Sequence, residues 1–342
     1  MKVLVVQTAF LGDVILTLPL IQTIKEHLQD ASVDVVVVPA AAPILAHHPA
    51  IRDVIVYDKN GADAGVTSFR RQVGLLQERM YKLAVVPHRS LRSAALSRMA
   101  KIPRRIGFDR SSGSWLFTDI VRYDPNAHEI ERNIRLLAPL SIAATGKILP
   151  SLFPSDADRA AAGSILGSSA DGGARSLVAM APGSVWNTKR WPAERFGEVA
   201  RRLGESGTSV VVVGGEADRA LGEAIVAGSG MPNVISAAGK LTLLQSAALI
   251  GMSRLLITND SAPMHIAVAM RTPVVAIFGA TVPSFGFAPY GERDVILETN
   301  GLKCRPCSVH GGDTCPIATF ECMLNISAEA VYARVKQLLG PA

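Results

Sequence analysis

Residues 253–265, SRLLITNDSAPMH, place an apolar, strand-like run directly before two polar residues, a proline and a histidine. Residues 255–258 have the composition of a buried strand, and a helix is predicted from residue 262 onward. In parallel sheets covered by helices, ligands bind beyond the carboxyl ends of the strands, near the amino ends of the following helices. Asp260 and His265 stand at such a junction, so the surrounding fold decides what this segment does.

Short Val- and Ile-rich runs alternate with helical stretches along both halves of the chain. Buried strands are predicted at residues 2–7, 33–39, 54–58, 82–88, 104–108, 176–183, 208–215, 233–239, 255–260 and 274–279. Helices are predicted at 12–28, 42–48, 68–80, 90–100, 192–207, 216–230, 242–252, 262–271 and 327–339. This alternation is typical of parallel sheets covered on both faces, so it predicts an α/β protein with two doubly wound domains in tandem.

The length of 342 residues exceeds one ordinary core and suits two domains. Residues 155–175 are predicted to form a helix that ends in a Gly/Ser-rich stretch, as at a domain boundary. We therefore predict a first domain over residues 1–160, a second over 176–325, and a terminal helix within 326–342.

The composition is that of a well-buried globular protein, with 49% hydrophobic and 19% charged residues. A net charge of +6 favours anionic partners or a membrane surface. Nucleic acid is not expected as a partner, because only 5% of residues are aromatic and no long basic run occurs. Asp13 interrupts the first apolar run and no small-residue cleavage site follows, so we expect a first strand and helix rather than a signal peptide, and a cytoplasmic location.

The loop TNDSAPMH (258–265) has the features of a phosphate site. Helix amino termini offer N–H groups and partial positive charge, and Ser261 and Ala262 are small enough to let a diphosphate approach the backbone. Pro263 suits a first helical turn. Taken alone, Asp260 has an alternative as a helix N-cap, and His265 as a packed core histidine.

Two further loops follow predicted strands. In PGSVWNTKRWP (182–192), Ser184 and Thr188 offer hydroxyls and Lys189 a compact charge suited to phosphate, the alternative being a solvated loop. AFLGDVILTLP (9–19) has one glycine and lacks G-x-G-x-x-G, so the usual dinucleotide fingerprint is absent. Asp13 is either a capping residue or a carboxylate that takes a proton from an acceptor hydroxyl.

In sequence, spacing and order, four segments together resemble the bacterial heptosyltransferases of glycosyltransferase family 9, which build the inner core of lipopolysaccharide. They are GDVILTLP (12–19), PGSVWNTKRWPAERF (182–196), GTSVVVVGGEADR (207–219) and TNDSAPMHIAVAMRTPVVAIFGATVP (258–283). The resemblance covers most of the chain and is strongest over 180–285. The TKRWP form and a later cysteine-rich segment are most similar to the second type, heptosyltransferase II.

The resemblance implies a GT-B fold, in which two Rossmann-like domains face each other across a cleft and the terminal helix returns toward the first domain. It implies ADP-L-glycero-D-manno-heptose as donor and a heptose or Kdo of the lipid A-linked core oligosaccharide as acceptor. Transfer would invert the anomeric centre without a catalytic metal. Peripheral contact with the inner face of the inner membrane is expected with such an acceptor.

The resemblance also implies roles for individual residues. Asp13 matches the general base and Lys189 the lysine that stabilises the leaving diphosphate. The nucleotide-sugar site would comprise Ser184, Thr188, Glu216, Asp260, Ser261, Ala262 and His265. Some relatives carry a second hydroxyl residue after the equivalent of Ser184, where this chain has Val185, so one diphosphate contact is not matched. Acceptor contacts are expected from Arg89, which follows a strand, and from Arg70 and Arg71, whose alternative is a solvated helix face.

All four cysteines fall in one segment, as Cys304, Cys307, Cys315 and Cys322, spaced C-x2-C-x7-C-x6-C. In a cytosolic enzyme this favours reduced thiols or a structural zinc over disulfides. Only the first pair has the usual spacing of a zinc site, and catalysis would not depend on the metal.

Two other functions remain open from the sequence. One is a GT-B glycosyltransferase or epimerase that uses another nucleotide sugar. The other is a periplasmic-type sugar-binding protein, which also pairs two α/β domains, although the expected absence of a signal peptide and the position of Lys189 argue against it.

Overall fold

β1 (Lys2–Val6) is a central strand of the first sheet, and its residues Val3 to Val6 are fully buried. The computed structural model describes residues 1–143, 146–167 and 177–340. The first sheet is six-stranded and parallel, with the order β3-β2-β1-β4-β5-β6. Its other strands are β2 (Ser32–Val37), β3 (Asp53–Val56), β4 (Leu83–Val86), β5 (Arg104–Phe108) and β6 (Asp119–Val121).

The second sheet is also six-stranded and parallel, with the order β12-β11-β10-β7-β8-β9. Its strands are β7 (Leu177–Ala181), β8 (Ser209–Val212), β9 (Val234–Ser236), β10 (Leu255–Asn259), β11 (Val274–Phe278) and β12 (Val295–Glu298). In both sheets the chain runs outward from a central strand, returns, and then continues toward the opposite edge. This is the Rossmann order, and two Rossmann-like sheets in one chain confirm the predicted α/β, GT-B fold class.

Several of the helices that cover the sheets present one apolar stripe. In α6 (Ala193–Glu205), Phe196, Val199 and Leu203 recur at helical spacing and are fully buried. The first unit also contains α1 (Leu11–His27), α2 (Val66–Glu78), α3 (Leu91–Met99) and α4 (Glu129–Arg135), with short 3-10 helices η1 (Pro39–Leu45), η2 (Ser114–Leu116) and η3 (Ala138–Leu140). The helix predicted at 42–48 overlaps η1, a 3-10 helix that ends at Leu45.

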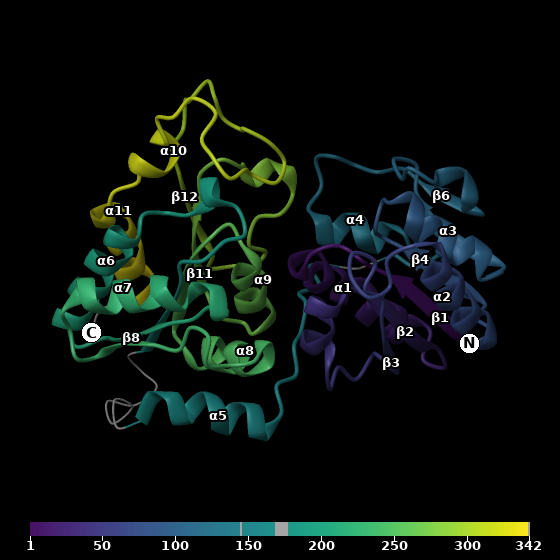
Figure 1. Cartoon of the computed structure of the whole chain (residues 1–342), viewed down its shortest axis with the longest axis horizontal. Helices are drawn as coiled ribbons and strands as arrows, with labels where there is room; N and C mark the ends of the chain where they lie inside the picture. Colours follow the sequence, from purple (N-terminus) through teal and green to yellow (C-terminus); the bar gives the residue numbers. More distant parts are fainter. Residues whose placement is uncertain (144–145, 168–176, 341–342) are drawn as a thin grey trace. The chain divides into compact units, whose positions relative to one another are not determined.

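In the second unit, α6, α7 (Arg219–Ser229) and α11 (Ala328–Leu339) lie on one side of the sheet, and α8 (Leu243–Met252) and α9 (Ala262–Ala269) on the other (Figure 1). The unit also contains α5 (Asp156–Leu166), α10 (Glu321–Leu324), η6 (Asn187–Lys189), η7 (Glu216–Asp218) and η8 (Pro283–Phe285). No helix of the described chain is both long and apolar enough to cross a membrane.

The contacts of the chain divide it after Phe153 into two units. The division falls inside the predicted first domain (1–160), because α5 packs against α8 of the second unit. The Gly/Ser-rich stretch and the predicted start of the second domain at residue 176 lie outside the described residues. α11 packs on α6, with Val331 and Val335 in the core of the second unit. Its predicted return toward the first domain stays a prediction.

Candidate active site

The three loops that follow β10, β7 and β8 lie side by side at the carboxyl edge of the second sheet. β7 and β10 are neighbours, and the chain continues from them toward opposite edges of the sheet. Such a switch point opens a crevice in which α/β proteins bind ligands. It brings together the donor residues predicted from the sequence: Ser184, Thr188 and Lys189 after β7, Glu216 after β8, and Asp260, Ser261, Ala262 and His265 after β10.

Lys189 and Asp260 form an ion pair at this switch point. Lys189 Nζ lies 2.6 Å from Asp260 Oδ2, and the two side chains are only 13% and 9% exposed. Thr281 Oγ1 donates to the same carboxylate oxygen at 2.6 Å. The N-cap of α9 is Ser261, and Pro263 lies in the first turn as expected. The alternative of Asp260 as an N-cap is therefore wrong, because its carboxylate binds Lys189 across the crevice.

The hydroxyl groups of the loop after β7 have separate environments. Thr188 is buried, its Oγ1 accepts the Gly312 N–H at 2.8 Å, and its own N–H donates to the Gly312 carbonyl at 3.0 Å. Ser184 is half-buried, its Oγ accepts the Trp186 N–H at 3.4 Å, and its carbonyl accepts Arg190 Nε at 2.7 Å. The Thr188 side chain is thus used inside the protein, whereas Ser184 keeps its place at the surface of the loop.

Asn259, which the sequence analysis did not single out, joins two of the loops. Its side chain is fully buried, with Nδ2 donating to the Pro182 carbonyl at 2.7 Å and Oδ1 accepting the Trp191 N–H at 3.0 Å. A single amide therefore bonds both ends of the loop that carries Lys189. A polar residue ending an otherwise apolar strand is the only signal in the sequence.

The remaining donor candidates differ in exposure. Glu216 is 72% exposed, and both its carboxylate oxygens accept hydrogen bonds from Arg219, which lowers the pKa of Glu216. Ser261 and Ala262 are half-buried at the start of α9, and His265 is buried one turn further along. The start of α9 is therefore the accessible part of this loop.

The first sheet has an equivalent switch point between β1 and β4. Asp13 follows β1 in the first turn of α1, half-buried, with Oδ2 accepting the Phe10 N–H at 3.2 Å. Arg89 follows β4. The two loops are joined by Thr8 Oγ1 and His88 Nδ1, which lie 3.0 Å apart. Burial, then the charges of Lys59 and Arg89, lower the pKa of His88 to about 4.

A cluster of arginines around Tyr123 was also missed from the sequence. The guanidinium carbons of Arg89, Arg110 and Arg132 lie 4.4, 5.8 and 4.8 Å from the ring centre of this buried tyrosine. Arg132 is buried and pairs with Glu129 at 2.9 Å, whereas Arg89 and Arg110 are exposed. Burial raises the pKa of Glu129, and the negative charge of Asp13 adds to this shift, so Asp13 lies within electrostatic reach of the cluster. No sequence spacing marks Tyr123 as their shared platform.

Arg70 and Arg71 lie on α2, which follows the edge strand β3 rather than a strand at the switch point. Both are exposed, and Arg71 pairs with Asp63 at 2.5 Å. Arg89 therefore lies at the switch point of the first sheet, whereas Arg70 and Arg71 lie on the helix that follows its edge strand.

Residues 67–315 match the family described as Glycosyltransferase family 9 (heptosyltransferase). The chain belongs to this family. Over 99% of both chains it is 29% identical to lipopolysaccharide heptosyltransferase 2 of Salmonella typhimurium. Two solved structures share the fold: a family 9 glycosyl transferase from Veillonella parvula, with TM-score 0.87, 25% identity and coverage of 99% and 97%, and E. coli ADP-heptose lps heptosyltransferase II, with TM-score 0.78, 24% identity and coverage of 99% and 98%.

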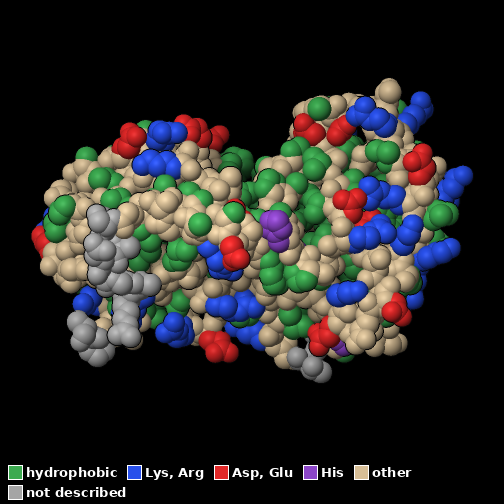
Figure 2. Space-filling model, turned by 90° about the horizontal axis from the view of Figure 1, so that it is seen from below, with side chains coloured by type: hydrophobic (Ala, Val, Ile, Leu, Met, Phe, Trp, Pro, Cys, Tyr) green, Lys and Arg blue, Asp and Glu red, His purple; other side chains and the backbone are tan. Residues whose placement is uncertain are grey.

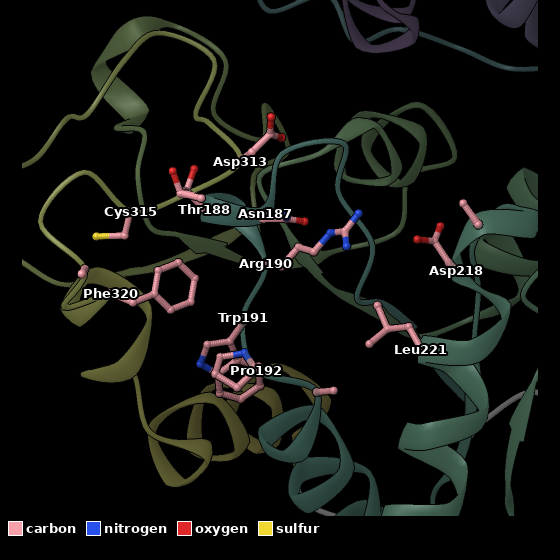
Figure 3. Close-up of a pocket in the computed structure, with 14 residues that line it drawn as sticks. Asn187, Thr188, Arg190, Trp191, Pro192, Asp218, Leu221, Asp313, Cys315 and Phe320 are labelled. Carbon is pink, nitrogen blue, oxygen red and sulfur yellow. The ribbon is translucent and has the colours of Figure 1, made fainter.

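The second unit of this glycosyltransferase contains a cavity of about 630 Å³ beside the Lys189 loop. Arg190 and Asp218 extend toward each other on one side, and Phe320 lies on the side formed by the cysteine-rich segment (Figure 3). Gly183 lies against Asp218, because a Cβ at Gly183 would be 2.3 Å from Asp218 Oδ1. The lining residues are Asn187, Thr188, Arg190, Trp191, Pro192, Ala193, Ala217, Asp218, Leu221, Asp313, Thr314, Cys315, Ala318 and Phe320.

Two of the four cysteines of this glycosyltransferase, Cys307 and Cys322, lie close enough to other thiols for their ionisation to be affected. Burial and the neighbouring thiols raise the pKa of Cys307 and Cys322, whereas hydrogen bonds from backbone N–H groups, led by Phe320, lower the pKa of Cys315. Within residues 1–143, 146–167 and 177–340, no three His, Cys, Asp or Glu side chains are arranged to hold a metal ion. The thiols are therefore not arranged as a metal site in this structure.

Proposed function

We propose that this chain transfers L-glycero-D-manno-heptose from ADP-heptose to a heptose or Kdo of the lipopolysaccharide inner core, with inversion at the anomeric carbon. The observation that carries the proposal is the Lys189–Asp260 ion pair at the switch point of the second sheet. A relative at 29% identity is named for heptosyl transfer in lipopolysaccharide, and ADP-heptose is in the name of a solved structure of the same fold.

The donor would bind beside the start of α9. Its diphosphate would meet the small residues Ser261 and Ala262 and the positive end of the helix, with Ser184 on the neighbouring loop. From its place beside Asp260, Lys189 would bind the leaving diphosphate and offset the charge that develops as the glycosidic bond breaks. Asp260 and His265 would then face the heptose, and the exposed Glu216 the nucleoside.

Asp13 would act as general base on the acceptor. As the acceptor oxygen bonds to the anomeric carbon, its proton passes to the Asp13 carboxylate and ADP departs with the electrons of the broken bond. Asp13 Oδ2 already accepts the Phe10 N–H, which holds the side chain at the start of α1. The role of a capping residue and that of a base are therefore compatible in one side chain.

The acceptor would be held by its negative charges. Arg89 and Arg110 stand on the face of Tyr123, and the described contacts of this part of the chain give neither a carboxylate partner. Exposed guanidinium groups fixed in this way suit the carboxylates and phosphates of a lipid A-linked core. Arg70 and Arg71 would act further from the reacting centre, on α2.

A lipid-linked acceptor would place the protein at the cytoplasmic face of the inner membrane, as a peripheral enzyme. The +6 net charge supports such a location. On the face shown in Figure 2, Lys and Arg side chains are spread among acidic and hydrophobic ones rather than gathered in one patch. We therefore propose that contact is made through the acceptor and its lipid, since this face offers no single basic surface for it.

The structural zinc predicted from the sequence rests on cysteine spacing alone. The proposed transfer does not require zinc, because the proposed base is Asp13 and the proposed diphosphate-binding group is Lys189. Elemental analysis of the purified protein tests the prediction: one zinc per chain, lost in a variant with all four cysteines replaced by serine, would support it, and a metal-free active protein would contradict it.

The main test compares nucleotides and one carboxylate variant. We expect the purified protein to bind ADP in preference to GDP and UDP, and to transfer heptose from ADP-heptose to lipid A-linked core. Asp13→Asn should abolish transfer and leave ADP affinity nearly unchanged, with Asp30→Asn on an exposed turn as the matched control. Preferential binding of UDP or GDP would favour the alternative of another nucleotide sugar, and an active Asp13→Asn variant would remove Asp13 from the mechanism.

A further inference from the structure

The cysteine-rich segment (residues 303–322) contacts the loop of the proposed leaving-group lysine. Gly312 exchanges two backbone-anchored hydrogen bonds with Thr188, at 2.8 and 3.0 Å. Gly311 lies against the stem of Lys189: a Cβ at Gly311 would be 3.0 Å from Lys189 Cγ and 3.1 Å from Cδ. The segment therefore borders both the backbone that carries Lys189 and its side chain.

The same segment also reaches the other member of the ion pair. The side chain of Arg305 is 6% exposed, and its guanidinium donates to the carbonyl of Thr281 at 2.8 Å and to Glu298 Oε2 at 2.6 Å. Thr281 in turn donates its hydroxyl to Asp260 at 2.6 Å. Gly311 and Gly312 therefore contact Lys189 and its loop, and Arg305 is connected to Asp260 through Thr281.

We propose that Gly311 and Thr188 are positioning residues, through which the cysteine-rich segment fixes the Lys189 ammonium group for the donor's diphosphate. The proposal rests on the proposed function in one respect, that the ligand is a nucleoside diphosphate. Thr188 then acts through the loop and not by touching the donor, since its hydroxyl is buried and bonded to Gly312. An ammonium held in place loses less freedom on binding, which favours affinity.

Glycine is required at residue 311 for two reasons. Its φ of +92° lies in the left-handed region, which side-chain-bearing residues rarely adopt, and an added Cβ would press on the Lys189 stem and on Thr188 Oγ1, at 3.0 and 3.2 Å. The turn is held by Ser308, whose Oγ accepts the Gly311 N–H and donates to the Gly311 carbonyl, both at 2.8 Å. Residue 311 therefore cannot move freely to relieve an added methyl group.

The neighbouring Gly312 provides a matched control. A Cβ there meets only the Thr314 carbonyl oxygen, at 3.9 Å. Gly312 makes its hydrogen bonds to Thr188 through its own backbone N–H and carbonyl, which an alanine retains. We expect Gly312→Ala to keep wild-type affinity for ADP and Gly311→Ala to weaken it about tenfold, the loss expected when a charge-assisted hydrogen bond is misplaced. Calorimetric titration with ADP measures both.

Thr188 supplies a second pair of variants should Gly311→Ala fail to fold. Thr188→Val removes the acceptor for the Gly312 N–H, whereas Thr188→Ser retains it. We expect the valine variant to raise the KM for the donor several-fold more than it lowers kcat at saturating donor, and the serine variant to restore the wild-type KM. Equal KM values in the valine and serine variants would overturn the proposal.

A readout without nucleotide separates this inference from the proposed function. Lys189 is 13% exposed and ion-paired, so its acetylation by an activated ester should be slow in the wild type and several-fold faster in Gly311→Ala and Thr188→Val. Faster acetylation supports the positioning role even if ADP is the wrong ligand. Wild-type acetylation rates in both variants would overturn it, even if ADP-heptose proves to be the donor.

Discussion

The backbone N–H of Trp191 donates to Asn259 Oδ1 at 3.0 Å, linking the entry of α6 to the end of β10. Since Asn259 Nδ2 also bonds the Pro182 carbonyl at 2.7 Å, one amide closes the loop 182–191 at both ends. Trp191 is itself buried and donates its indole N–H to the Ile326 carbonyl at 3.0 Å. The position of Lys189 thus depends on groups that never touch it.

Replacing Asn259 by alanine should lower the stability of the second unit. The substitution leaves a buried N–H and a carbonyl without their partner, which costs roughly 2–4 kcal/mol in the free energy of unfolding. Thermal denaturation followed by circular dichroism should show the loss, with the exposed Asn300→Ala as control. An Asn259→Ala variant as stable as the control would show that water or a local shift replaces the amide.

Asp260→Asn should tighten the binding of ADP while slowing transfer. In the structure the Lys189 ammonium is neutralised by Asp260, so an incoming diphosphate must compete with a carboxylate. Removing that charge should favour ADP by about 1 kcal/mol, or roughly fivefold in affinity. Titration calorimetry at two salt concentrations measures the effect, and weaker ADP binding in the variant would mean that Asp260 holds the lysine ready rather than competing for it.

Arg89→Gln and Arg110→Gln should each raise the KM for the acceptor without changing ADP affinity. Both guanidinium groups lie over Tyr123, and each charge-assisted contact to a carboxylate or phosphate is worth about 1.5–3 kcal/mol, roughly a ten- to hundredfold change in KM. Arg98→Gln, on the exposed end of α3, serves as control. Steady-state kinetics with varied acceptor decides, and an unchanged KM in both variants would exclude the Tyr123 cluster from acceptor binding.

The first unit should lose stability as the pH falls from 6.5 toward 4. Burial lowers the pKa of His48 to about 4, and burial with nearby positive charge does the same for His88. Between pH 4 and the ordinary histidine pKa of 6.5, the unfolded chain binds more protons than the folded one. The folded protein therefore keeps its full free energy of unfolding above pH 6.5 and loses part of it as the pH falls. The upper limit of this loss is about 3 kcal/mol for each histidine. Urea unfolding at pH 7.5 and 5 should show this, and the pH dependence should be smaller in His88→Gln. An equal dependence in that variant would exclude His88 as a source.

The central strands and the loops 9–19, 182–192 and 258–265 were predictable because the residues that mark them are adjacent in the sequence. Continuous Val and Ile runs mark strands buried on both faces, and the loops follow directly at the strand ends. The edge strands β6 and β12 were not predicted, and neither contains a buried residue, whereas the equally short edge strands β3 and β9 each contain one and were predicted. Short edge strands lack the long apolar run that identifies a central one.

Residues whose role depends on partners far away in the sequence could not be predicted from the sequence. Asn259 bonds a backbone group 68 positions away, and Thr188 pairs with a glycine 124 positions away. Tyr123 becomes a platform only when three arginines from separate segments converge on its ring. Asp13 and Lys189 were singled out from their loops and given specific catalytic roles by the resemblance, and these roles stay predictions.

The identical strand order of the two sheets has a consequence for how specificity can change. Each half has a complete sheet with its own switch point, and the two halves are divided in sequence after Phe153. Under the proposed function, substitutions that alter the preferred acceptor fall in one half and leave recognition of the activated sugar to the other. Chimeras joined at this boundary should therefore inherit their acceptor from one parent and their nucleotide from the other.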